Sequence, residues 1–105
     1  MNAKTRLQQI EEMLADDPND PFLRYCLAME HSAQADNEEA ARCFHGLIEV
    51  APDYVPAYMQ LGQVLVRLGR TDEAGQVWSR GIAQAQKKGD QHAFEEMQGF
   101  LANLK

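Results

Sequence analysis

The sequence predicts an all-α fold of about six helices, and three observations lead to this prediction. Apolar residues recur at the three- and four-residue spacing that places them on one face of a helix. The apolar–polar alternation of a half-buried strand occurs nowhere in the chain. Large residues also recur at an offset of 34 residues, as in Leu27 and Leu61 or Phe44 and Trp78. This offset predicts that one helical unit is repeated along the chain.

Capping and turn residues divide the chain into helical segments. Asp20 followed by Pro21 is typical of a helix start, because Asp accepts from free backbone N–H groups and Pro lacks one. Gly69 stands where a helix leaves through a left-handed residue. Further N-cap candidates are Asn37, Asp53, Thr71 and Asp90. The expected helices span about 3–16, 20–34, 37–50, 54–68, 71–87 and 90–104.

The predicted helices carry apolar faces that combine large and small side chains. Phe44 and Trp78 are expected to fill the core between neighbouring helices. Small residues are expected where helix axes approach closely, since a larger side chain would push them apart. These small residues are Ala28, Ala40, Gly62, Ala74 and Gly81.

The 34-residue recurrence carries a specific residue pattern. Its first copy reads Leu27, Ala28, His31, Ala40, Phe44 and Pro52, and its second reads Tyr58, Leu61, Gly62, Leu65, Gly69, Ala74 and Trp78. This pattern resembles the tetratricopeptide repeat (TPR) family. The resemblance implies a right-handed superhelix of antiparallel helix pairs, a TPR-like solenoid that works as a non-catalytic protein-interaction module.

With 105 residues the chain has room for a single domain. The resemblance predicts how this domain is divided. A half-repeat helix is expected at 3–18, complete repeats at 21–54 and 55–88, and a capping helix at 89–105, all within one domain over 1–105. Arg6 departs from the family pattern, which has Ala at that place. The flanking helices are expected to be structural, because two repeats alone bury too little apolar surface.

The composition of the chain indicates which kinds of partner and which cellular location to expect. The formal net charge is −6, which argues against binding a phosphate backbone and therefore against a nucleic-acid partner. No apolar run reaches the ~20 residues that a membrane span needs, and the N-terminus shows no apolar signal region. Two cysteines without disulfide spacing predict reduced thiols and a cytoplasmic location.

The sequence predicts no enzyme, no cofactor and no metal site. It contains no phosphate-binding glycine loop, dinucleotide fingerprint or zinc-protease motif. Neither Cys43 with His45 nor Cys26 with His31 has the i, i+4 spacing of a helical chelate. His31 is instead expected in the interior, where the family carries a large aromatic residue, and both cysteines are expected to be buried.

Beside the face that packs into the core, the helices at 20–34 and 54–68 each carry a second stripe of residues. This second stripe is the expected partner site. The resemblance implies that this stripe lines a concave groove for a partner protein. Its members are Phe22, Tyr25, Met29, Ser32, Met59, Gln60, Gln63, Val66 and Arg67. An apolar, methionine-containing groove suits an apolar peptide or amphipathic helix. The alternative is a homo-oligomer, possible as a homodimer, that buries this groove against its own copy.

Overall fold

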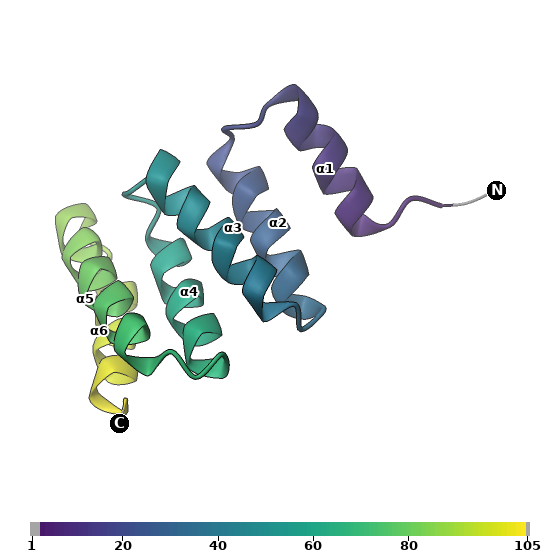
Figure 1. The fold of residues 1–105 in the computed structure, drawn as a ribbon. Coiled ribbons are helices and arrows are strands. Elements are labelled where there is room, and N and C mark those ends of the chain that lie inside the picture. The colour runs from purple at the N-terminus through teal and green to yellow at the C-terminus, as the bar shows by residue number, and fades with distance from the viewer. Residues whose placement is uncertain (1–2, 105) are drawn as a thin grey trace.

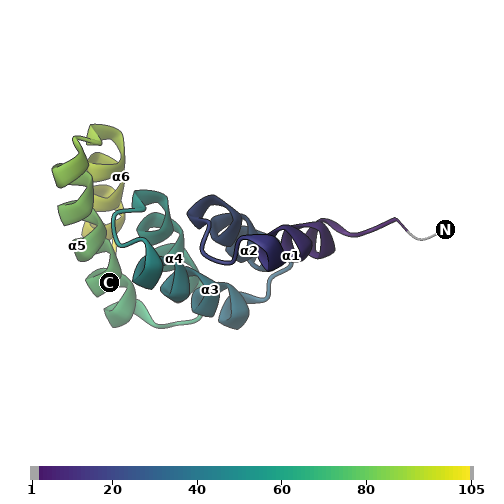
Figure 2. The same cartoon turned by 90° about the horizontal axis from the view of Figure 1, so that it is seen from above.

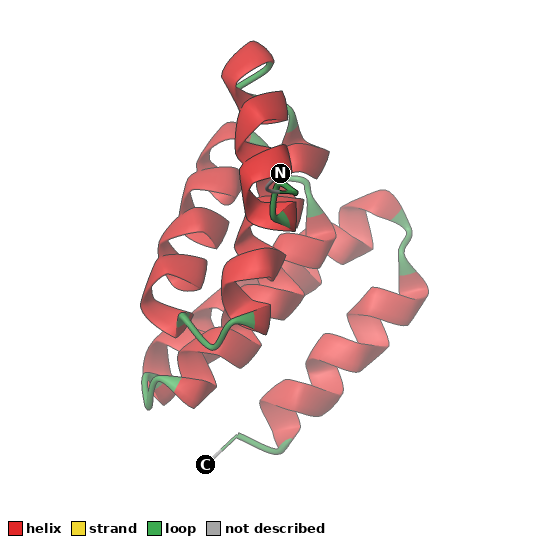
Figure 3. Cartoon of the chain, turned by 90° about the vertical axis from the view of Figure 1, so that its right-hand side faces the viewer, coloured by secondary structure: helices red, strands yellow, loops and turns green. Residues whose placement is uncertain are grey.

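The computed structural model of the protein describes residues 3–104, and all of its regular structure is helical (Figure 1). The helices are α1 (Arg6–Asp16), α2 (Pro21–Ala33), α3 (Asn37–Val50), α4 (Val55–Arg67), α5 (Thr71–Lys88) and α6 (Gln91–Ala102). Short loops join them, and residues 3–104 contain no strand (Figure 3). The all-α prediction with about six helices is confirmed.

The helices pack mainly against their neighbours in the chain, which gives a helical-repeat solenoid. The molecule is elongated, with principal extents of 49 × 28 × 20 Å. Figure 2 shows an arc in which α2, α4 and α6 follow the inner side, while α3 and α5 follow the outer side. An elongated stack of this kind is expected when each helix pair contacts only the adjacent pairs.

The N-cap residues in the structure agree in part with those predicted from the sequence. Asp20 and Asp90 each accept a hydrogen bond from the backbone three residues later, as predicted. Asp36, rather than Asn37, caps α3. Tyr54 and Arg70 occupy the N-cap positions of α4 and α5 without a side-chain cap, so Asp53 and Thr71 were wrong predictions. Each error amounts to one residue. Asp36 and Asn37 both suit an N-cap, whereas α4 and α5 begin without any side-chain cap.

The core is built from residues of α2 through α6, and it contains the residues predicted for it. Phe44, Leu61 and Trp78 are buried, and each comes from a different helix. The small residues lie at close helix contacts. A Cβ atom on Gly62 would stand 2.1 Å from Nε1 of Trp78, so only glycine fits beside this ring.

The two end helices are attached in different ways. α1 buries only Ile10 among its described side chains, and Arg6 pairs with Glu30 of α2 at 3.4 Å. α6 buries Met97 completely, against a surface where Gly81 leaves room. The C-terminal helix is therefore packed more deeply than the N-terminal helix.

Within residues 3–104, no helix has the length and apolar character that crossing a membrane requires.

Candidate functional site

The predicted groove residues occupy the inner-side helices α2 and α4. Phe22 and Val66 are exposed, with 62% and 39% of their surface accessible. Tyr25, Met29 and Met59 are half-buried and pack against the core with part of their side chains. The remaining members of the set range from half-buried to exposed, and they are Ser32, Gln60, Gln63 and Arg67.

Two contacts join the α2 residues of this set to the α4 residues. Arg67 Nη2 donates a hydrogen bond of 2.8 Å to Ser32 Oγ near the C-terminal ends of the two helices. The side chain of Gln60 lies close to the Tyr25 hydroxyl, and its interaction with that hydroxyl lowers the pKa. The pKa of the Tyr25 hydroxyl is nevertheless raised, chiefly by burial and then by the nearby Tyr54. The two stripes therefore form one continuous surface at these points.

Phe22, Tyr25 and Met29 also line a hollow of about 500 Å³ between α1 and α2. Its other lining residues are Arg6, Cys26, Glu30 and Ala33. The Arg6–Glu30 ion pair brings both charged side chains of this lining together. The hollow thus offers an apolar floor with one neutralised charge pair. The contribution of α1 was not predicted, since only the packed structure shows which side of α2 this helix covers.

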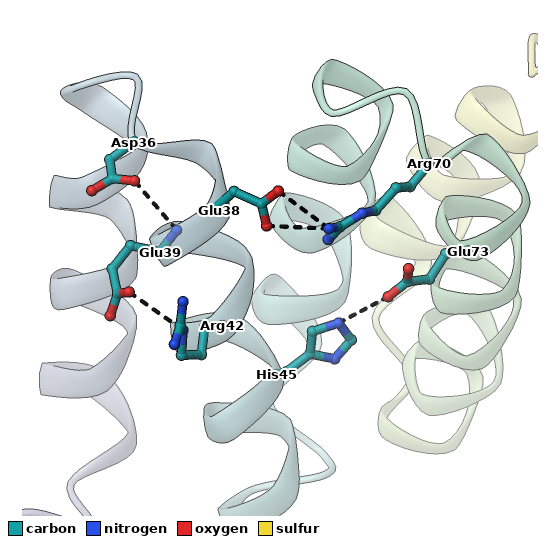
Figure 4. Close-up of polar contacts among 7 residues, drawn as sticks. All are labelled: Asp36, Glu38, Glu39, Arg42, His45, Arg70 and Glu73. Carbon is teal, nitrogen blue, oxygen red and sulfur yellow. Dashed lines mark hydrogen bonds and ion pairs between the residues drawn. The ribbon is translucent and has the colours of Figure 1, made fainter.

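Polar pairs connect the outer-side elements (Figure 4). Arg70, just before α5, approaches both carboxylate oxygens of Glu38 on α3 at 3.2 Å. His45 of α3 lies 3.1 Å from Glu73 of α5. All four side chains are at least 41% exposed, so each pair adds little to stability. They are best understood as aligning the second helices of successive pairs.

A cluster of a different kind lies between α2 and α3. The ligand atoms of His31, Glu39 and Cys43 all lie within 4.8 Å of one another. All three residues are half-buried, so the expectation that His31 is an interior residue is wrong. Cys26 and Cys43 are also only half-buried, contrary to the prediction. The fold brings His31 together with Cys43. Neither of the pairs considered from sequence spacing, Cys43 with His45 or Cys26 with His31, is this pair.

This cluster was missed because His31 and Cys43 are twelve residues apart, on different helices. A partial signal was present, since Glu39 and Cys43 are four residues apart and share one face of α3. The missing information was the rotation of α2 about its own axis, which turns His31 toward α3 instead of into the core.

Comparison with known proteins agrees with this architecture. The family model of the tetratricopeptide repeat matches residues 31–104. A TPR repeat-containing protein of Pseudomonas aeruginosa is 32% identical over 98 residues, which are 93% of this chain and 93% of that protein.

Two solved structures have similar folds. One is a tetratricopeptide repeat domain protein from Salinibacter ruber, solved by NMR, with a TM-score of 0.77 at 40% sequence identity. The match covers 81% of this chain and 86% of that protein's chain. A protein from Bordetella parapertussis has a TM-score of 0.83 at 29% identity, over 95% of this chain and 87% of its own.

The chain therefore belongs to the tetratricopeptide repeat family. Proteins of this family are generally non-catalytic modules that mediate protein–protein interaction.

Proposed function

We propose that this protein binds an amphipathic helix or apolar peptide of another protein, without catalysis. The binding surface consists of the predicted groove residues on α2 and α4, together with the hollow between α1 and α2. The observation that carries the proposal is the exposed Phe22 ring at the edge of an apolar hollow of about 500 Å³. Exposed apolar surface beside a concave site is typical of protein-interaction sites.

The chemistry of the surface favours an apolar ligand over a charged one. Phe22, Tyr25 and Met29 supply apolar contact area, and methionine adapts its shape to different partners. Arg6 and Glu30 neutralise each other, and Arg67 is held by Ser32 and Asn37. A net charge of −6 argues against nucleic acid as the partner, and the free thiols of Cys26 and Cys43 are consistent with a cytoplasmic setting.

The test uses Phe22 and Val66, the two exposed apolar members of the surface. Phe22→Gln with Val66→Gln removes exposed apolar area and leaves the core intact, so the melting temperature should stay near that of the wild type. The matched control is Met13→Gln with Val50→Gln, which changes side chains that are 48% and 45% exposed outside the proposed surface. Met29 and Met59 are poorer targets because they pack partly against the core.

A displayed peptide library is panned against each protein to supply a ligand. We expect the wild type to enrich peptides with apolar residues at i, i+3, i+4 and i+7, and the Phe22/Val66 variant to bind them at least about tenfold more weakly. The Met13/Val50 control should bind as the wild type does. Equal binding by both variants would contradict the proposal. A wild-type dimer that the Phe22/Val66 variant converts to a monomer would instead support self-association through this surface.

A further inference from the structure

We propose that His31, Glu39 and Cys43 form a three-ligand site for a thiophilic divalent cation, with Zn²⁺ the best match and water as the fourth ligand. One imidazole, one carboxylate and one thiolate are all zinc ligands, and three protein ligands plus water is a common zinc arrangement. The ligand atoms already lie within 4.8 Å of one another. This inference is independent of the peptide-binding surface.

The turn between α2 and α3 fixes the three residues relative to one another. The backbone N–H of Asp36 donates to the carbonyl of His31 at 2.9 Å. The Asp36 carboxylate in turn accepts from the backbone N–H of Glu39 at 3.4 Å. Since Cys43 follows Glu39 by one helical turn, its side chain lies on the same face. The backbone that carries the three ligands is therefore held in place without a metal.

The side-chain contacts leave ligand positions for a cation. Arg42 Nε lies 3.3 Å from Oε1 of Glu39 (Figure 4). Cys43 Sγ lies 3.9 Å from Oε2, so the two oxygens face different neighbours. Among residues 3–104, the His45 and His92 rings each lie beside a carboxylate, at 3.1 and 3.6 Å, whereas the His31 ring has no such ion pair. His31 is thus the histidine in this part of the chain whose ring nitrogens face a thiol and a carboxylate together.

Metal binding here requires only small movements. Zinc bonds of about 2.0–2.3 Å hold the ligand atoms of a tetrahedral site about 3–4 Å apart. The remaining difference from 4.8 Å is of the size that rotations about the side-chain bonds of His31, Glu39 and Cys43 produce.

The chemical balance of the step is simple. Burial, followed by the charge of Glu39, raises the pKa of the Cys43 thiol to about 11, so the metal-free protein carries S–H at neutral pH. Binding forms a metal–sulfur bond and releases that proton to solvent, with no change of oxidation state.

Cobalt(II) is the probe, because a cysteine thiolate bound to Co²⁺ gives a charge-transfer absorption that water and carboxylate ligands do not give. We expect the wild type to show this absorption on Co²⁺ addition and to lose it when Zn²⁺ is added in equal amount. Cys43→Ser should abolish the absorption. Cys26→Ser is the matched control, since Cys26 is also a free, half-buried thiol, and it should retain the absorption.

The other two ligands are tested by affinity. His31→Gln and Glu39→Gln should each weaken Zn²⁺ binding by at least about tenfold in a titration against a chromophoric chelator. His45→Gln and Glu38→Gln are the matched controls and should leave it unchanged. Zn²⁺ should also raise the melting temperature of the wild type but not of Cys43→Ala, which separates lost binding from lost folding. Absorption that survives Cys43→Ser, no absorption in the wild type, or equal weakening by the control variants would overturn the proposal.

Discussion

Ala35 and Gly69 occupy equivalent turns, one before α3 and one before α5, and both have a left-handed backbone. Their φ angles are 61° and 79°. Glycine adopts this conformation freely, whereas an alanine Cβ approaches the following carbonyl and costs about 1–2 kcal/mol. The first turn therefore carries local strain that the second avoids. This difference between two related positions can be tested directly.

We expect Ala35→Gly to stabilise the protein by about 0.5–1 kcal/mol, because relief of the strain exceeds the added freedom of the unfolded chain. Gly69→Ala should destabilise it by about 1 kcal/mol, since nothing lies within 4 Å of the new methyl group and only the backbone conformation is affected. Urea unfolding of both variants measures the effects. Changes of the same sign in the two variants would contradict the strain argument.

The pKa of Cys43 predicts its chemical reactivity. Because burial and Glu39 raise this pKa from an ordinary 9.0 to about 11, the reactive thiolate is scarce at pH 8. In the metal-free protein, alkylation of Cys43 should accelerate about tenfold per pH unit between pH 8 and 10, since the thiolate fraction rises by that factor. Iodoacetamide labelling with peptide mass spectrometry separates Cys43 from Cys26.

Two variants test the electrostatic part of this argument. Glu39→Gln removes a negative charge beside the thiol, so it should lower the pKa and speed alkylation at pH 8. Glu38→Gln is the control, because its carboxylate is directed to Arg70. Labelling that levels off below pH 9 would show that burial does not suppress the thiolate.

At the scale of the element, α6 closes the apolar end of the stack. Met97 is fully buried, and the Phe100 ring lies 5.2 Å from that of Trp78. α5 depends on this contact because Gly81 and Trp78 would otherwise face water. The end helix of a repeat stack commonly provides such a cover.

Removing residues 90–105 should therefore lower stability by at least about 2 kcal/mol, the scale of one fully buried large side chain. Met97→Ala keeps the helix and should cost about 2–5 kcal/mol on its own. Circular dichroism during urea unfolding checks both proteins, and sedimentation detects aggregation of the shortened chain. A 1–89 fragment that unfolds at the wild-type urea concentration would show that α6 is not a structural cap.

Across the whole molecule, the buried residues are concentrated in α3, α4 and α5, with few in α1, α2 and α6. α4 buries Tyr58, Leu61 and Leu65 completely or nearly so, whereas α1 buries Ile10. Neighbour interfaces carry much of the stability of a repeat protein, so this asymmetry should produce unequal local stability.

We expect amide hydrogen exchange to be slowest in α4 and α5 and fastest in α1. The reason is that local opening of α1 exposes little apolar surface, whereas opening of α4 separates α3 from α5. Exchange followed by mass spectrometry on the full chain makes this measurement. Protection of α1 equal to that of α4 would mean that the stack opens as one cooperative unit.

The class of fold and the order of the helices follow from the pattern of amino acids alone. Helical periodicity depends on residues three and four apart, and the 34-residue recurrence of Phe44 with Trp78 depends on one repeated unit. Both are patterns along the chain, so both can be read without coordinates. The division into repeats and the partner-binding surface remain predictions.

Which side chains from different helices meet depends instead on how the helices pack. This packing turns His31 toward Glu39 and Cys43, and it places α1 beside Phe22 to form the hollow. These contacts depend on the rotation of each helix about its axis and on its position relative to the next helix. No local spacing encodes those quantities, because they result from how all the apolar faces pack at once.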